Sequence, residues 1–210
     1  MDKYCLIITG GDPIDVNLAK ELAQSASFLL GVDKGADFAL ELGLTLDLVV
    51  GDFDSISRKA ESMYRDISVS FPKDKDFTDT ELAISEAINR GYLHIKAINV
   101  TGDRIDHVLA TMMLLYRFKN ADVEIIGNGF RAFLVSGWKE IRNEKGKTFS
   151  MIPVSERIKN VSLSGFKYPL VKHNVNLGES LCVSNIVSED LATIDIDDGD
   201  AIVIITNLEE

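Results

Sequence analysis

The sequence predicts an α/β fold class, with an N-terminal parallel-sheet domain of Rossmann-like type followed by a C-terminal antiparallel β-sandwich domain. Up to about residue 129, short apolar runs alternate with segments of helical periodicity, which is typical of a parallel sheet with right-handed crossovers. After Gly127-Asn128-Gly129, the apolar runs are short, rich in β-branched residues and separated by Gly, Asn, Asp and Pro. This second pattern indicates antiparallel strands. We therefore expect two domains, residues 1–129 and 130–210.

The composition bounds the class of protein. Of the 210 residues, 46% are apolar, which is enough for a sizeable core. The net charge of −11 argues against general nucleic-acid binding, which needs a basic face. No apolar run approaches the roughly 20 residues that cross a membrane. Met1-Asp2-Lys3 lacks the basic segment of a signal peptide, and Cys5 and Cys182 lack disulfide or zinc spacing. We therefore expect a cytoplasmic protein with buried thiols.

Each expected strand of the first domain is an apolar run, and the expected helices follow the turns between these runs. The strands are expected at residues 4–9, 28–32, 46–50, 67–71, 94–100 and 122–126. The helices are expected at residues 13–25, 38–42, 57–65, 82–89 and 105–118. Pro13 suits the first turn of a helix, and Thr78 with Glu81 forms a capping box. The second domain is expected to place strands at residues 132–135, 147–152, 161–164, 180–183, 191–196 and 201–206.

Acidic residues gather where the expected parallel strands end. Asp33 follows the second strand, and Gly51-Asp52-Phe53-Asp54-Ser55 follows the third. The carboxyl edge of an open α/β sheet is where ligands bind. In an extended segment Asp52 and Asp54 would point the same way and share one cation, while Phe53 would anchor the turn in the core. Such a pair suits Mg²⁺, which usually binds through one or two carboxylates plus substrate phosphates.

Purely structural roles remain open for these residues. Asp, Ser and Gly are ordinary turn residues, and Asp33 could cap the helix that follows it.

Two further strand ends mix acids with bases. Lys73 and Lys75 are suited to phosphate oxygens, and Asp79 would stay ionised near the positive end of a helix dipole. A solvated charged loop is the alternative for this segment. After the strand at residues 94–100, Arg104 can reach a polyphosphate and Asp106 lies near the start of a helix.

Together these motifs resemble the thiamine pyrophosphokinase family. The matching segments follow the family's order over nearly the whole chain, and seven such segments in order are specific where one would be weak. They are residues 33–37, 51–55, 73–81, 102–107, 149–153, 165–170 and 184–185. Two departures are modest. Asp33-Lys34-Gly35-Ala36-Asp37 stands where many members have Asp-Gly-Gly-Ala-Asn, and Tyr168 is Trp in the animal proteins.

The resemblance implies transfer of the pyrophosphoryl group of ATP to the hydroxyethyl oxygen of thiamine, giving thiamine diphosphate and AMP. It implies a homodimer with active sites shared between subunits, an ATP- and Mg²⁺-binding first domain and a thiamine-binding second domain. Tyr168 could stack on the cationic thiazolium, which is worth about 0.5–2 kcal/mol. Whether Asp79 binds metal or accepts the hydroxyl proton stays open.

The site residues implied by the resemblance fall into three groups. The catalytic group is Asp52, Asp54, Asp79 and Asp106, and the first three of these are also the implied metal ligands. The ATP-binding group is Lys73, Lys75, Thr78, Asp103, Arg104 and His107. The thiamine-binding group is Asp33, Ser150, Tyr168, Ser184 and Asn185.

Two alternatives come from other classes of protein. A Mg²⁺-dependent phosphatase of haloacid-dehalogenase type also begins with an apolar strand and Asp-x-Asp, and its closing motif resembles Gly102-Asp103. Asp106 comes one residue too early for that motif, and that fold would keep alternating where this chain becomes β-rich. The other alternative is a non-catalytic sensor of thiamine diphosphate or nucleotide. Such a sensor has little use for so many strand-end carboxylates without a metal.

Overall fold

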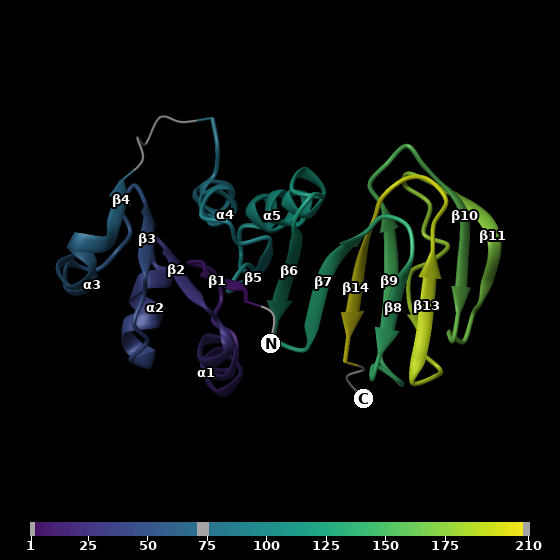
Figure 1. The fold of residues 1–210 in the computed structure, drawn as a ribbon, viewed down its shortest axis with the longest axis horizontal. Helices are drawn as coiled ribbons and strands as arrows, with labels where there is room; N and C mark the ends of the chain where they lie inside the picture. Colours follow the sequence, from purple (N-terminus) through teal and green to yellow (C-terminus); the bar gives the residue numbers. More distant parts are fainter. Residues whose placement is uncertain (1–2, 71–75, 208–210) are drawn as a thin grey trace. The chain divides into compact units, whose positions relative to one another are not determined.

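The structure is a computed structural model that describes residues 3–70 and 76–207 (Figure 1). Its contacts divide the chain into two compact units, residues 1–128 and 129–210. The first unit is a parallel α/β domain and the second is built from antiparallel sheets, so the predicted fold class is confirmed. In the described ranges no helix is both long and apolar enough to span a membrane. Cys5 and Cys182 are buried free thiols, and burial raises their pKa to about 12 and about 11.

The sheet of the first unit is parallel throughout its described strands, in the order β6-β5-β1-β2-β3-β4. Its strands are β1 (Cys5–Ile8), β2 (Phe28–Val32), β3 (Leu48–Gly51), β4 (Ser68–Ser70), β5 (His94–Ile98) and β6 (Asp122–Gly127). Its helices are α1 (Val16–Ser25), α2 (Gly35–Leu42), α3 (Arg58–Tyr64), the 3-10 helix η1 (Arg65–Ile67), α4 (Asp79–Asn89) and α5 (Ile105–Arg117).

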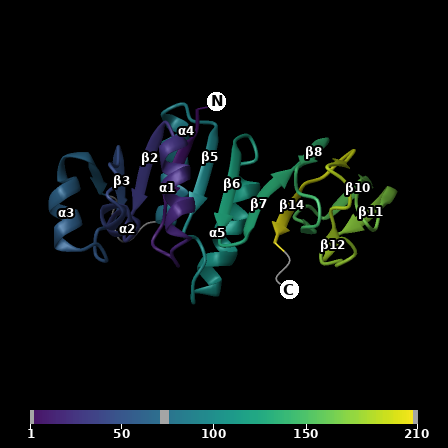
Figure 2. The same ribbon diagram turned by 90° about the horizontal axis from the view of Figure 1, so that it is seen from below.

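Helices cover both faces of this sheet because its central strands are apolar on both sides. Every residue of β1 is buried, with Leu6 and Ile8 in the same core cluster as Ala19 of α1 and Ala39 of α2. Helices α1 and α2 lie on one face, and α4 and α5 lie on the other (Figures 1 and 2). Such two-sided burial is typical of parallel sheets.

The order of the strands fixes where a ligand can bind. The chain starts at the centre with β1, builds outward through β2, β3 and β4, and returns with β5 on the other side of β1. The connections after β1 and β5 therefore diverge at the carboxyl edge of the sheet. In open α/β sheets this switch point is where ligands bind.

The second unit contains two antiparallel sheets. One has the order β12-β9-β14-β7, formed by Asn185–Ile186, Thr148–Pro153, Ala201–Thr206 and Phe130–Val135. The other has the order β11-β10-β13-β8, formed by Leu170–Asn176, Arg157–Ser164, Leu191–Asp195 and Lys139–Arg142. One apolar cluster joins them, and in it the rings of Phe149 and Phe166 lie 4.4 Å apart. This is the predicted β-sandwich.

The sequence misplaced one strand of the second unit and missed two others. Residues 180–183 were expected to form a strand, but they form turns, and the short strand β12 follows at Asn185–Ile186. Of the four, Cys182 alone is buried, so this apolar run has no continuous face to place against the core. Strands β8 and β11 were not predicted. The middle of β11, Lys172–Asn174, is polar and exposed at a sheet edge, where the apolar alternation of a strand is lost.

Candidate active site

The ends of β2 and β3 are in close contact at the carboxyl edge of the sheet. Asp33 directly follows β2, and its N–H donates to the carbonyl of Val50 at 3.1 Å. A Cβ atom added to Gly51 would lie 1.8 Å from Asp33 Oδ1. Only glycine therefore fits at the end of β3, and its absent side chain lets the Asp33 carboxylate lie beside the backbone that leads into Asp52.

Asp52 and Asp54 lie in a tight turn after β3. The Asp54 N–H donates to Asp52 Oδ1 at 3.1 Å, and Phe53 has φ of 61°, in the left-handed region. The expectation that residues 52–54 are extended is therefore wrong, because the backbone at Phe53 adopts the left-handed conformation. Phe53 packs against the core cluster, as predicted. The turn uses one oxygen of Asp52, and Asp54 is exposed.

A hydrogen bond joins the segment 33–37 to the chain just after the segment 51–55. Asp37 Oδ2 accepts the N–H of Ser57 at 3.0 Å, which ties the first turn of α2 to the start of α3. The segments 33–37 and 51–55 thus form one local structure at the ends of β2 and β3.

The loop after β1 also belongs to this edge, although the sequence pattern there predicted only a turn. Gly11 and Asp12 donate their N–H groups to the carbonyls of Asn99 at 2.8 Å and Thr101 at 2.7 Å. An added Cβ atom at Gly11 would lie 2.3 Å from those two oxygens. Asp12 lies near Gly102, whose added Cβ would be 3.7 Å from Asp12 Oδ1. The Gly-Gly pair immediately after the first strand was the available signal.

Buried Asn99 fixes this junction of β1 and β5. It is 1% exposed and has φ of 59°. Its side-chain oxygen accepts the N–H of Ile14 at 2.9 Å, so the amide is oriented by its donor. The residue therefore ties the β1–α1 loop to the strand that carries the segment 102–107.

Arg104 and Asp106 form a two-pronged ion pair at the start of α5. Arg104 Nε lies 2.9 Å from Asp106 Oδ1, and its terminal nitrogen lies 2.7 Å from Oδ2. The hydrogen bonds from Arg104 hold the pKa of Asp106 well below its usual range, and the same contact raises the pKa of Arg104. Both side chains are exposed, as are Asp103 and His107 beside them. A fixed, charged guanidinium is therefore presented to solvent here.

The start of α4 shows the Thr78 half of the predicted capping box. Thr78 Oγ1 accepts the N–H of Glu81 at 3.2 Å, and Asp79 is the first helical residue. The carboxylate of Glu81 forms an ion pair with Arg117 of α5. Lys73 and Lys75, predicted to bind ATP, lie outside the described residues.

The predicted thiamine-side residues of the second unit lie together. The N–H of Ser184 donates to Ser150 Oγ at 3.1 Å. Asn185 bonds the backbone of Tyr168 twice, through Oδ1 at 3.0 Å and Nδ2 at 2.7 Å. Tyr168 is 58% exposed. The structure thus joins these residues in two hydrogen-bonded pairs that adjoin in sequence at Ser184–Asn185.

The chemistry of the described acids fits Mg²⁺ held partly by a substrate. Among residues 3–70 and 76–207, no group of three or more His, Cys, Asp or Glu side chains is placed to hold a metal ion. Asp52 and Asp54 belong to one turn, Asp52 is partly exposed and Asp54 is exposed, and Mg²⁺ commonly takes one or two carboxylates plus phosphate oxygens. Ligation by Asp79 stays a prediction.

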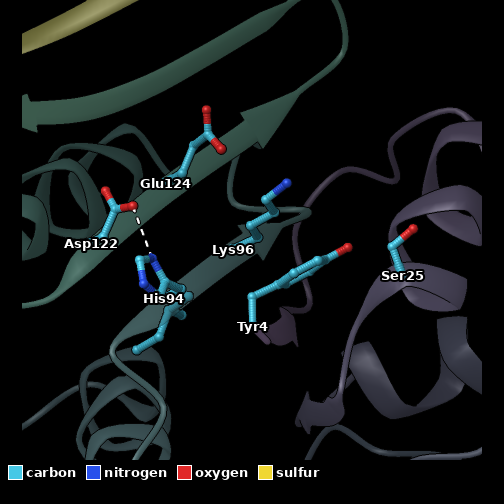
Figure 3. A pocket seen from close by; sticks show the side chains of 7 residues that line it. Tyr4, Ser25, His94, Lys96, Asp122 and Glu124 are labelled. Atoms are coloured by element: carbon cyan, nitrogen blue, oxygen red, sulfur yellow. Dashed lines mark hydrogen bonds and ion pairs between the residues drawn. The ribbon is translucent and has the colours of Figure 1, made fainter. Parts of the chain in front are cut away.

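A pocket of about 260 Å³ lies elsewhere in the first unit (Figure 3). His94 and Asp122 begin β5 and β6, so the pocket lies at the amino edge, opposite the strand ends described above. Its charged side chains face groups of the protein itself. His94 Nδ1 is 3.2 Å from Asp122 Oδ2, and Lys96 Nζ lies 4.6 Å from the centre of the Tyr4 ring. The carboxyl edge remains the candidate site.

Models of known families match both units. The family described as "Thiamin pyrophosphokinase, catalytic domain" matches residues 19–127. The family described as "Thiamin pyrophosphokinase, vitamin B1 binding domain" matches residues 139–199.

Known proteins resemble the chain over most of its length. Thiamine pyrophosphokinase of Bacillus subtilis is 33% identical over 190 residues, which cover 85% of this chain and 87% of that protein. Thiamine pyrophosphokinase 1 of Oryza sativa is 26% identical, covering 72% of this chain and 62% of the rice protein. The crystal structure of thiamin pyrophosphokinase from Geobacillus thermodenitrificans has a TM-score of 0.87 at 26% identity, covering 99% of each chain.

Proposed function

The chain belongs to the thiamine pyrophosphokinase family, and we propose that it transfers the pyrophosphoryl group of ATP to the hydroxyethyl oxygen of thiamine. In this reaction the hydroxyl oxygen of thiamine loses its proton and bonds to the β-phosphorus, the bond from that phosphorus to the α-phosphate oxygen breaks, and AMP leaves. The products are thiamine diphosphate and AMP.

One observation carries the proposal beyond family membership. The carboxylate of Asp33 lies against Gly51, directly before the turn that holds Asp52 and Asp54. Acids from two adjacent strand ends thus meet at the carboxyl edge of the sheet. Phosphoryl transfer depends mainly on positioning and on neutralising phosphate charge. Asp52 and Asp54, with Asp79 as a further ligand, would hold Mg²⁺, which neutralises charge on the phosphates.

The remaining roles follow from the charges at neighbouring loops. Arg104 binds phosphate oxygens. For Asp106, which the resemblance places in the catalytic group, we propose that it acts through Arg104, because its carboxylate accepts two hydrogen bonds from the guanidinium. The other residues proposed to bind ATP are Thr78, Asp103, His107, Lys73 and Lys75. The exposed ring of Tyr168 stacks on the cationic thiazolium, with Ser150, Ser184 and Asp33 on the thiamine side.

A product assay tests this function and separates it from the alternatives. The protein is incubated with Mg²⁺, thiamine and ATP labelled at the γ-phosphate. We expect label in thiamine diphosphate and one AMP for each product molecule, with neither formed when thiamine is omitted. Release of labelled inorganic phosphate would identify a phosphatase, and absence of any product would favour a sensor. The comparisons lend no support to either alternative.

Asp47→Asn is a matched control for carboxylate variants in this assay. Asp47 lies just before β3, at the amino edge, and its Oδ2 accepts the N–H of Leu29 at 2.8 Å. Asp54→Asn removes the same charge at the carboxyl edge. We expect product from the first variant and almost none from the second.

We also propose that the protein acts as a homodimer with active sites shared between subunits, and that it works in the cytoplasm. These proposals rest on the family resemblance and on the sequence.

A further inference from the structure

The loop that carries Tyr168 is attached to the chain just before Ser188 by a short antiparallel ladder. Phe166 forms an isolated antiparallel bridge with Val187. The N–H of Lys167 donates to the carbonyl of Ile186 at 2.8 Å. The next partner in this antiparallel sequence is Asn185, opposite Tyr168. At that position the ladder continues through a side chain.

The side chain of Asn185 takes the place of a backbone partner. Its Oδ1 accepts the N–H of Tyr168 at 3.0 Å and the N–H of Ile186 at 2.8 Å, while its Nδ2 donates to the carbonyl of Tyr168 at 2.7 Å. Two N–H donors fix which end of the amide is oxygen. Asn185 is 5% exposed, whereas Tyr168 is 58% exposed. The buried side-chain amide of Asn185 thus holds the backbone of the exposed residue Tyr168.

We propose that Asn185 is a positioning residue that holds the Tyr168 loop in its binding conformation, and that it does not itself contact thiamine. This inference rests on the proposed function, because Tyr168 matters only if its ring binds substrate. A loop that is fixed before binding loses less conformational freedom when the ligand binds. The affinity of the site for that ligand is therefore higher. The geometry assigns this fixing role to the amide, because both its oxygen and its nitrogen are bonded to backbone.

Kinetics of three variants test the assignment. Asn185→Ala should raise KM for thiamine about tenfold, the size expected when one or two buried hydrogen bonds are lost, and leave KM for ATP unchanged. Tyr168→Ala should raise the same KM. Both changes act on the same stacking contact of Tyr168. The double variant should therefore have a KM for thiamine no higher than that of the more impaired single variant. Effects that multiply would overturn the inference, because independent contacts add in free energy.

Asn185→Asp separates positioning from direct contact. The aspartate can still accept the Tyr168 N–H, but it cannot donate to the Tyr168 carbonyl, and it places a negative charge near that oxygen. A positioning role predicts a raised KM for thiamine. If Asn185 touched the cationic substrate, the added negative charge would keep or lower KM, and that outcome would refute the proposal.

Amide hydrogen exchange of the wild-type protein tests the contact without any assay of activity. We expect the Tyr168 N–H to be protected although its residue is exposed, and to lose that protection in Asn185→Ala, which removes its acceptor. Asn174→Ala is the matched control, since it removes a single side-chain bond to the Asn160 N–H in the same unit. Rapid exchange of Tyr168 in the wild type would contradict the assignment even if Asn185→Ala failed to fold. If the wild type made no thiamine diphosphate, the proposed function would fail, and exchange would still decide whether Asn185 holds Tyr168.

Discussion

At the scale of single residues, the site depends on the absence of a side chain at one position as much as on its charged side chains. Gly51 lacks the side chain that would collide with Asp33, and Phe53 adopts a left-handed conformation that closes the turn after β3. Such strained positions persist where the surrounding structure holds them. Here the surroundings are the Asp52–Asp54 hydrogen bond and the packing of Phe53 on the core.

Asp52→Asn, Asp54→Asn and Asp79→Asn should each lower turnover about 100-fold or more, because each removes a charge proposed to bind the metal or to accept a proton. Stability should change little. The amide introduced by Asp52→Asn keeps an oxygen that can accept the Asp54 N–H, and Asp54 is exposed. Calorimetry and initial rates at saturating Mg²⁺ measure both effects. An Asp54→Asn protein that unfolds, or that keeps its full rate, would exclude this assignment.

Gly51→Ala should damage the site more than the fold. The new Cβ must displace the Asp33 carboxylate, and the backbone at φ of 153° adds strain of about 1–3 kcal/mol. Gly43→Ala supplies the control, because Gly43 has φ of 71° but no atom within 4 Å of the added Cβ. Both variants should melt at lower temperature. At a temperature where both variants are folded, activity should survive only in Gly43→Ala, and equal activities would show that the Asp33 contact is dispensable.

At the scale of elements, burial decides which strands could be predicted from the sequence. Strand β1 is buried at all its positions, so its apolar run was sufficient to find it. Strand β11 has four consecutive exposed residues at a sheet edge, and no periodicity marks it. Its pairing with β10 spans two register shifts, which only the folded chain displays.

The candidate site was predictable for the same reason in part. Acids at Asp33, Asp52 and Asp54 follow apolar runs, so their common edge could be deduced from the parallel order. The left-handed turn at Phe53 could not, because aromatic residues rarely adopt it. The bonds from Asn185 to Tyr168 could not either, since a buried amide and its partner 17 residues away share no local pattern.

The cap of α4 should serve both stability and binding. Thr78→Ala removes the acceptor for the Glu81 N–H and should cost about 1 kcal/mol, or roughly 2–4 °C in Tm. Thr78→Asp restores an acceptor and should restore Tm. It should still raise KM for ATP, because the proposed hydroxyl donor to phosphate is replaced by a negative charge. Calorimetry and ATP titration of the rate separate the two roles. Full recovery of both in Thr78→Asp would limit Thr78 to capping.

At the scale of the whole molecule, the proposed reaction needs the nucleotide residues of the first unit and Tyr168 of the second. The family resemblance implies that a second subunit completes each site. The second unit has only about 80 residues, a size that benefits from a partner surface. Its exposed Tyr168 loop offers aromatic area of the kind that anchors interfaces.

Complementation between two impaired variants tests the shared site, with the rate measured at a thiamine concentration well below KM, where the raised KM of Tyr168→Ala leaves that variant little activity. An Asp54→Asn protein is mixed with a Tyr168→Ala protein, and the subunits are allowed to exchange. If each site takes its carboxylates from one chain and the Tyr168 loop from the other, a mixed dimer has one site with both defects and one with neither. Activity should return to about a quarter of wild type, because about half the dimers are mixed and each has one intact site of two. A sample in which mass spectrometry shows mixed dimers but no activity returns would mean that each pocket is built within one chain.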